Sequence, residues 1–302
     1  MRKFLCKLYL STLSMPSWMQ KTKIGGIIRK ATSIIYEKYI IFNYSHSAPI
    51  TKTKSDVIVS LTSFPKRIQT LWMVIECLMH QTVAPKKIIL WLSELQFPDK
   101  GNLPSKLIEQ QERGLEIRFV PEDLRSHKKY YYTFLEYPDS PVILADDDIL
   151  YSPTLIEELL QDFAPGKIHC SYGSYITRNQ DGTVRPYNQW SKKPQKTNFE
   201  DVFFGTGGGT LMIPSDLSED KCKKELFTEL CPLADDVWLN TMARINKLSI
   251  IKVRTEPIIP IKINDNETLA ASNLSKEAKI NNDIQIENVN RYYFDITGEK
   301  IF

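Results

Sequence analysis

The chain has 302 residues, 42% of them hydrophobic and 25% charged, so it is long and apolar enough to bury the core of one large domain or two small ones. Its formal charge of +3 excludes a strongly basic chain, and we expect no nucleic-acid partner. The cysteines are odd in number and lack metal-ligand spacing, which predicts free thiols in a reducing cytosol; they are Cys6, Cys77, Cys170, Cys222 and Cys231.

Positive charge is concentrated at the N-terminus. Residues 1–40 hold eight Lys/Arg and one Glu, whereas the remainder holds 31 basic and 35 acidic residues. Apolar residues recur there at helical spacing, with lysines and arginines around them: Ile24, Ile27, Ile28, Ala31, Ile34 and Ile35. Two interpretations remain open, a helix that lies on the anionic inner face of the cell membrane and a helix that packs its isoleucines on the domain.

The remaining features of the N-terminus do not predict export. Lys7 interrupts the first apolar stretch, no small-residue cleavage site follows it, and no segment is long enough to span a bilayer. We therefore expect a cytoplasmic protein, either free or peripheral at the membrane. The predicted organisation is a basic amphipathic segment over residues 1–45 and one domain over residues 55–302.

From residue 56 onward, strand-like and helix-like patterns alternate. Strands are predicted over 56–61, 86–92, 115–120 and 142–145, and helices over 68–81, 103–113 and 127–137. Such alternation is typical of an α/β fold with a doubly wound, mostly parallel, Rossmann-like sheet. After residue 148 the alternation weakens, and we expect the second half to complete the same domain.

Three consecutive carboxylates, Asp146, Asp147 and Asp148, close the apolar run over 142–145. In an open α/β sheet, ligands bind at the carboxyl ends of the strands, where the loop over 62–67 would also lie. Because three clustered negative charges repel one another, a divalent cation with oxygen ligands is the usual relief. The triplet then forms part of a cleft; the alternative is a solvated acidic turn that caps a helix starting near Ser152.

Three further motifs could carry chemistry. The glycine cluster over 205–210 lacks the pattern of a phosphate-cradling or dinucleotide-binding loop, so it either lets the backbone approach a ligand or forms a flexible turn. Lys128 and Lys129 open a helix, where they face a phosphate or only solvent. Asp235 and Asp236 precede a helix-like run, as a simple cap or as a base for metal-assisted group transfer.

These motifs, in this order, resemble bacterial glycosyltransferases of the GT-A fold, family 2-like, of the kind found with capsule and surface-polysaccharide biosynthesis. The resemblance covers about residues 56–254, and its order of motifs is specific for the fold but not for the sugar. It rests on Ser60-Leu61-Thr62-Ser63-Phe64-Pro65-Lys66-Arg67, Ser126-His127-Lys128-Lys129, Ala145-Asp146-Asp147-Asp148-Ile149-Leu150-Tyr151, Thr206-Gly207-Gly208-Gly209 and Cys231-Pro232-Leu233-Ala234-Asp235-Asp236-Val237-Trp238.

The resemblance implies that the acidic triplet is an Asp-x-Asp motif, with Asp148 and Asp146 at a Mn²⁺ or Mg²⁺ ion that bridges the diphosphate of the donor. It also implies that Asp236 is the base that deprotonates the acceptor, with Asp235 as the competing choice. The donor-binding residues that it implies are Thr62, Ser63, Arg67, Lys128, Lys129, Asp146, Asp147, Gly207 and Gly208.

One departure from the family concerns the metal. Many members add a C-terminal histidine to the metal site, but all the histidines here precede the glycine cluster; they are His46, His80, His127 and His169. The cation would then depend on carboxylates, phosphate and water, which suits Mg²⁺ or Mn²⁺ better than zinc and predicts loose binding.

The main prediction is a metal-dependent, inverting glycosyltransferase of the hexosyltransferase type. It would move a sugar from a nucleotide-sugar donor, a UDP-sugar, to the hydroxyl of a glycan or lipid-linked acceptor in surface-polysaccharide biosynthesis. Two alternatives are kept. One is a sugar nucleotidyltransferase, which the absence of glycine in the loop over 62–67 disfavours; the other is a non-catalytic nucleotide-sugar-binding protein.

Overall fold

The computed structural model describes residues 53–193, 201–253, 255, 259–261 and 280–302, with isolated positions between 22 and 39. Its helices are α4 (Ile68–Met79), α5 (Ser105–Glu112), α6 (Lys128–Glu136), α7 (Leu155–Leu160), α8 (Lys224–Leu230), α9 (Asp235–Ile245) and α11 (Asn282–Thr297). Short 3-10 turns are η1 (Arg125–His127), η2 (Tyr187–Gln189), η3 (Pro214–Asp216) and η4 (Glu219–Cys222). Among the helices in this part of the chain, none has the length and apolarity needed to cross a bilayer.

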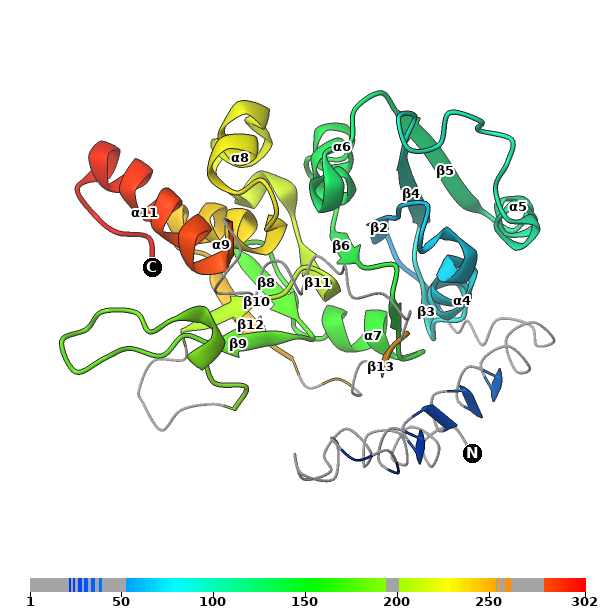
Figure 1. Cartoon of the computed structure of the whole chain (residues 1–302), viewed down its shortest axis with the longest axis horizontal. Coiled ribbons are helices and arrows are strands. Elements are labelled where there is room, and N and C mark those ends of the chain that lie inside the picture. Colours follow the sequence, from blue (N-terminus) through cyan, green and yellow to red (C-terminus); the bar gives the residue numbers. More distant parts are fainter. Residues whose placement is uncertain are drawn as a thin grey trace.

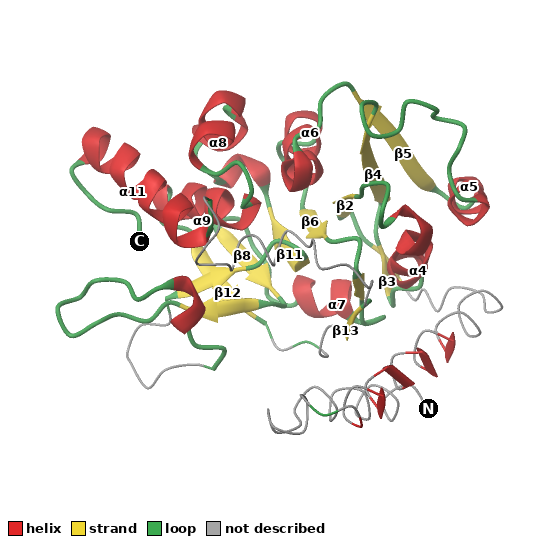
Figure 2. Ribbon diagram, in the orientation of Figure 1, coloured by secondary structure: helices red, strands yellow, loops and turns green. Residues whose placement is uncertain are grey.

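A seven-stranded sheet forms the centre of the molecule, with the strand order β12-β8-β11-β6-β2-β4-β5 (Figure 2). Six of these strands run in one direction and β11 runs against its neighbours β6 and β8. The strands are β2 (Ile58–Thr62), β4 (Lys87–Ser93), β5 (Leu115–Val120), β6 (Val142–Ala145), β8 (Lys167–Cys170), β11 (Gly208–Met212) and β12 (Ser249–Lys252). The predicted α/β fold with a mostly parallel, doubly wound sheet is confirmed.

Smaller strands pair outside this sheet. In two-stranded pairs, β1 lies beside β3, β10 beside β9, and β13 beside β7. These strands are β1 (Thr53–Lys54), β3 (Val83–Ala84), β7 (Ile149–Leu150), β9 (Gly173–Tyr175), β10 (Val202–Phe204) and β13 (Ile259–Pro260).

Helices cover both faces of the sheet (Figure 1). Alternate residues of β2 show this division: Val59 and Leu61 belong to a buried cluster with α4 and α7, and Ile58 belongs to a second cluster with α6, α9 and α11. Because side chains alternate across a strand, one apolar run supplies both cores. Strands buried on both faces are therefore nearly continuous in apolar residues, which is the pattern that made them predictable.

The first half follows the predicted elements closely. The strands over 115–120 and 142–145 have the predicted bounds, and the other predicted elements differ by at most two residues at either end. In the second half, β11 begins at Gly208, inside the glycine cluster, because a register shift beside β6 is accommodated by Gly209 at φ +95°. Residues 206 and 207 of the cluster do form a turn, whereas Gly208 and Gly209 belong to a buried strand with a bulge.

One sequence expectation concerns the N-terminal end of the chain. The five isoleucines at positions 24, 27, 28, 34 and 35 are 38–69% exposed. The interpretation in which these side chains pack on the domain is therefore wrong. Tyr39 nearby does pack against the cluster under α4. At the other end, α11 (Asn282–Thr297) is the last helix of the described chain. Residues 1–21 and 262–279, and with them most of the predicted 1–45 segment, lie outside the described residues.

The predicted free thiols are confirmed at four positions. Cys77, Cys170, Cys222 and Cys231 are free, and Cys6 lies outside the described residues.

Candidate active site at the carboxyl edge of the sheet

The predicted site residues come from elements that end or begin at one edge of the sheet. β2 and β6 are parallel neighbours, and the chain leaves β2 toward one side of the sheet and builds outward from β6 on the other. This reversal of strand order is a topological switch point, where open α/β sheets bind ligands. Thr62 and Asp146 lie at the carboxyl ends of these two strands, and Gly208 of the antiparallel β11 pairs with Ala145 at the same edge.

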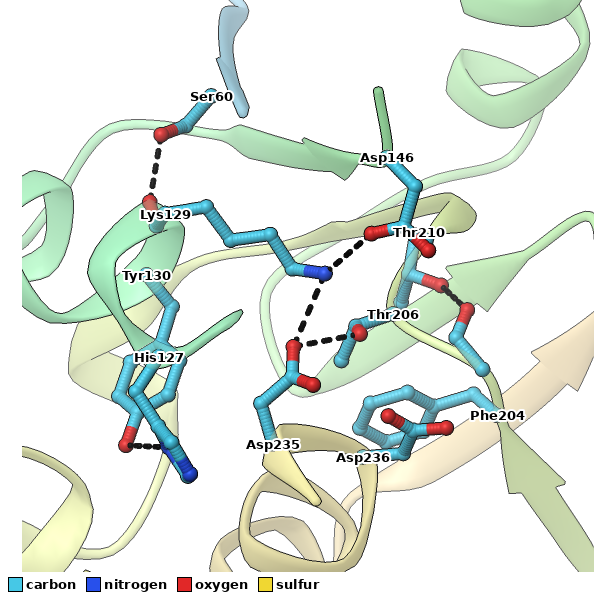
Figure 3. A network of polar contacts seen from close by, with 12 residues as sticks. Ser60, His127, Lys129, Tyr130, Asp146, Phe204, Thr206, Thr210, Asp235 and Asp236 are labelled. Atoms are coloured by element: carbon cyan, nitrogen blue, oxygen red, sulfur yellow. Dashed lines mark hydrogen bonds and ion pairs between the residues drawn. The ribbon is translucent and has the colours of Figure 1, made fainter. Parts of the chain in front are cut away.

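A buried lysine lies at the centre of this edge. The ammonium of Lys129, on the first turn of α6, is 2.6 Å from Asp146 Oδ1 and 3.0 Å from Asp235 Oδ2, as Figure 3 shows. Only 2% of the Lys129 side chain is exposed. Burial would lower the pKa of Lys129, but the charges of Asp146 and Asp235 outweigh it and raise that pKa, so the ammonium stays charged.

Asp147 of the acidic triplet is turned inward. It accepts a 2.6 Å hydrogen bond from Ser63 Oγ and a 2.7 Å bond from Arg67 Nη1, and its side chain is 6% exposed. The same Arg67 nitrogen is 2.9 Å from Asp148 Oδ2. Burial, followed by the charge of Asp146, raises the pKa of Asp148 to about 7. The loop after β2 therefore holds the triplet in place, while Asp146 and Asp148 keep exposed oxygens.

The glycine cluster leaves room for the triplet. A Cβ atom at Gly207 would lie 1.6 Å from Asp146 Oδ2, so a side chain at this position would displace the carboxylate. Gly208 is also too close to another residue for a side chain, because a Cβ there would lie 2.3 Å from Tyr172 Cβ. The close approach predicted for these glycines is therefore to protein side chains. Their assignment to the donor sugar stays a prediction.

The later carboxylate pair begins α9. Asp235 accepts a 2.7 Å hydrogen bond from Thr206 Oγ1 in addition to the Lys129 ammonium. Burial would raise the pKa of Asp235, but the charge of Lys129 outweighs it and lowers that pKa. For Asp236, burial and then the charge of Asp235 raise the pKa to about 8. Asp235 is thus an ionised partner of Lys129, while Asp236 retains its proton through neutral pH.

Other predicted residues lie nearby but have different partners. Lys128 is buried and forms an ion pair with Asp123. Because Lys129 is buried as well, the alternative prediction that the two lysines face only solvent is wrong. Thr62 Oγ1 donates a 2.8 Å hydrogen bond to the carbonyl oxygen of Trp91. The structure does not bring the Lys128 ammonium or this hydroxyl into the Lys129 network.

Two residues of the site carried no predicted role. Tyr151 is fully buried, and its hydroxyl accepts a 2.7 Å hydrogen bond from the Asp146 backbone and donates to the Gly207 carbonyl. It joins the acidic turn to the glycine cluster. Thr206 holds Asp235. Both belong to motifs on which the family resemblance rests, but their partners are far away in sequence, so their residue types alone do not reveal these roles.

The carboxylates of the site are the donors that a metal ion could use. In the described part of the chain, no group of three or more His, Cys, Asp or Glu side chains is arranged to hold a metal ion. Asp146 and Asp148 offer two carboxylates that are 41% and 27% exposed. Hard oxygen donors of this kind fit Mg²⁺ or Mn²⁺ when substrate phosphates and water complete the coordination.

Comparisons with known proteins found similarity to solved structures only. No family model and no curated protein matches the chain. The inositol-1-phosphate CTP transferase from T. maritima is 12% identical, with a TM-score of 0.39, over 79% of this chain and 95% of its own. HddC from Yersinia pseudotuberculosis is 18% identical, with a TM-score of 0.32, over 54% of this chain and 77% of its own.

A third similar structure comes from Bacillus anthracis. It is assigned as a glucose-1-phosphate thymidylyltransferase, is 12% identical, and has a TM-score of 0.33 over 54% of this chain and 72% of its own. The prediction of a glycosyltransferase acting on a glycan or lipid-linked acceptor is contradicted by these comparisons, because the activities that the structures are named for are nucleotidyl transfers. The GT-A resemblance is likewise unsupported beyond the α/β fold.

Proposed function

We propose that this protein is a metal-assisted nucleotidyltransferase that joins a nucleoside triphosphate to a sugar phosphate. A phosphate oxygen of the sugar phosphate attacks the α-phosphorus of the triphosphate. The bond from this phosphorus to the oxygen of the β-phosphate breaks, and pyrophosphate leaves with the electron pair. The product is a nucleoside diphosphate sugar. A sugar nucleotidyltransferase is the alternative function that the glycine-free loop over 62–67 disfavours.

The observation that carries the proposal is the state of the carboxylates around Lys129. Transfer to a neutral hydroxyl needs a free ionised base, but Asp235 is bound by Lys129 and Thr206. A phosphate nucleophile is already ionised at neutral pH and needs no base, only cations that offset the charge of the reacting phosphates. A divalent ion at Asp146 and Asp148 would supply that positive charge, while Lys129 and Arg67 hold the carboxylates in place.

The loop after β2 also has a role in this proposal. Its lack of glycine counted against a nucleotidyltransferase, because such enzymes use a glycine-rich basic loop there. Here the loop instead supplies Ser63 and Arg67 to the acidic triplet. Because the side chains of this loop position the carboxylates, its backbone does not need to approach a ligand closely. Glycine is therefore not required in the loop. Asp146 and Asp148 would hold the divalent ion, which when bound neutralises charge on the triphosphate.

Turnover tests this function directly. Glucose 1-phosphate is incubated with each of the common nucleoside triphosphates and Mg²⁺, and pyrophosphate release is followed. We expect release with at least one triphosphate, its loss with EDTA, and a fall of about 100-fold in kcat/KM for Arg67→Gln. The exposed variant Lys193→Gln serves as the control with unchanged rates. Absence of pyrophosphate with every pair, or release that EDTA leaves unaltered, would overturn the proposal.

We also propose that the N-terminal segment binds an anionic bilayer surface. Ile24, Ile27, Ile34 and Ile35 are 41–69% exposed at helical spacing. They belong to the segment over residues 1–40, which holds eight basic residues and one acidic residue. An exposed apolar stripe within strongly positive sequence complements acyl chains under anionic headgroups.

Sedimentation with vesicles tests the membrane proposal. We expect the full chain to bind phosphatidylserine-containing vesicles, to bind phosphatidylcholine vesicles weakly, and to lose about tenfold in affinity in the double variant Ile24→Ser, Ile27→Ser. Ile296→Ser is a matched control, because Ile296 is 63% exposed on α11, outside the basic segment. Equal binding by the double variant and the control would contradict the proposal.

A further inference from the structure

Two lysines lie together beside the candidate active site without a carboxylate. Lys192 Nζ donates hydrogen bonds to Ser174 Oγ at 2.6 Å and to Tyr172 Oη at 3.1 Å. Lys252 Nζ donates to the carbonyl oxygens of Gly173 at 2.8 Å and Lys192 at 3.4 Å. Within the described ranges, neither lysine forms an ion pair.

Pairing with a carboxylate is common but not general among the lysines of the described structure, and Lys192 and Lys252 are distinguished by lying together. Six of the lysines are paired with a carboxylate oxygen at 3.0 Å or less: Lys87, Lys100, Lys128, Lys129, Lys223 and Lys224. At Lys252, burial lowers the pKa, and the charge of Lys192 lowers it further. Two ammonium groups held together without a counter-charge are relieved when an anion binds between or beside them.

The lysine pair is connected to the catalytic network through Tyr172. The Tyr172 ring packs on the glycine loop (residues 205–208), because Cβ atoms built at Gly205 and Gly208 would lie 2.9 Å and 2.3 Å from its side-chain atoms. The same loop carries Thr206, which bonds Asp235, and Gly207, which packs against Asp146. A ligand on Lys192 would therefore lie next to the loop that shapes the site.

The donor set indicates which chemical group fits. Two ammonium groups and the hydroxyls of Tyr172 and Ser174 provide many donors in one place. A neutral sugar ring needs acceptors as well as donors for its hydroxyls. A phosphate monoester needs only donors and positive charge, and charge-assisted bonds to its oxygens are strong.

We propose that Lys192, Lys252 and Tyr172 form the binding site for the phosphate group of a sugar phosphate, the second substrate. This inference rests on the proposed nucleotidyl transfer, in which such a phosphate is the nucleophile. The site lies on the side of the glycine loop that β9 and β12 provide, apart from the Arg67 side where the acidic triplet is held.

Lysine footprinting tests the site without turnover. The protein is acetylated in the presence of glucose 1-phosphate, inorganic phosphate or glucose, and the modification rate of each lysine is measured by mass spectrometry. We expect glucose 1-phosphate to slow modification of Lys192 and Lys252 several-fold, inorganic phosphate to do so at higher concentration, and glucose to have no effect. Lys193, an exposed neighbour, is the internal control. Unchanged rates at Lys192 and Lys252, or equal protection of Lys193, overturn the inference.

Kinetics separate this inference from the proposed function. Lys192→Gln and Lys252→Gln should each raise KM for glucose 1-phosphate about tenfold and leave KM for the triphosphate unchanged, with Lys193→Gln as control. Lys192→Arg should restore most of the loss, and thermal unfolding checks that each variant is folded. Protection of both lysines without any turnover supports the anion site while the proposed function fails. Turnover with unchanged KM in both variants overturns the site while the function stands.

Discussion

Two buried carboxylate clusters differ in how their charge is balanced. Between α4 and α5, Glu76 accepts hydrogen bonds from Gln110 at 2.8 Å and from both Arg113 nitrogens at 2.6 and 3.0 Å, so that one carboxylate meets one guanidinium. At the carboxyl edge of the sheet, Lys129 and Arg67 face the acidic triplet and the Asp235–Asp236 pair.

The difference separates a cluster that needs no further partner from one that supports the ligand site we propose. The balanced pair of Glu76 and Arg113, with its further hydrogen bond from Gln110, needs no additional counter-charge, and it links α4 to α5. An unbalanced cluster leaves carboxyl groups whose pKa values are raised, here to about 7 for Asp148 and about 8 for Asp236. Such imbalance in a group of side chains at a switch point is typical of a functional site.

The largest expected effect comes from removing the central cation. Lys129→Met leaves the buried Asp235 without its ammonium and removes the cation beside Asp146, and we expect a loss of about 3–5 kcal/mol in the free energy of unfolding. Urea unfolding measures it. Loss of nucleotide binding should accompany it, and calorimetry on the folded fraction checks this. A variant as stable as the parent would contradict the central role of Lys129.

Breaking the balanced cluster should affect stability alone. Glu76→Gln removes the charge that Arg113 and Gln110 contact, and the expected loss is about 2–3 kcal/mol, because Arg113 is partly exposed and can be solvated. Turnover of the folded variant should equal that of the parent. If kcat/KM falls as it does in the Arg67→Gln variant, the division between structural and functional clusters is wrong.

A smaller effect is expected at the glycine loop. Gly207→Ala forces Asp146 to move, since the new Cβ would lie 1.6 Å from its oxygen, and we expect a loss of about 1–2 kcal/mol in stability together with reduced turnover. Gly101→Ala is the control, because a Cβ there has an ordinary 3.5 Å contact. Equal thermal midpoints for the two variants would show that the packing against Asp146 is not restrictive.

The most gradual effect is a pH dependence, which is small per pH unit. The pKa of Asp236 is raised from 3.8 to about 8 in the folded state, so the folded protein binds more protons than the unfolded chain between these values. Stability should therefore fall as pH rises through this window, by at most about 1.4 kcal/mol per pH unit for one proton. Asp236→Asn should flatten the slope of urea stability against pH, whereas the exposed Asp139→Asn should not. An unchanged slope in Asp236→Asn would contradict the raised pKa.

Much of the first half could be predicted from the sequence. The strands β5 and β6 have the predicted bounds because buried parallel strands are continuous apolar runs bounded by polar residues. The position of the acidic triplet at the carboxyl end of β6 is predictable because the triplet directly follows the apolar run that forms this strand. The predicted α/β class followed from the alternation of strands and helices.

The partners within the site could not be predicted in the same way. Lys129 and Asp235 are separated by more than 100 residues, and their contact depends on how α6 and α9 lie over one face of the sheet. Lys128 and Lys129 are adjacent in sequence, yet one meets Asp123 and the other Asp146. The prediction that Asp236 acts as a base could not take into account its burial beside Asp235, which only the fold shows. The glycosyltransferase prediction, which needed such a base, is contradicted.

The most direct test of nucleotidyl transfer follows the oxygen that links the sugar to its phosphate. Glucose 1-phosphate labelled with ¹⁸O at this bridging oxygen is converted with a nucleoside triphosphate and Mg²⁺, and the product is analysed by mass spectrometry. Nucleotidyl transfer leaves the bond between carbon and bridging oxygen intact, so the nucleotide sugar should retain all of the label and pyrophosphate should form in equal amount. Loss of the label from the sugar product would show cleavage at the sugar carbon and would contradict the account.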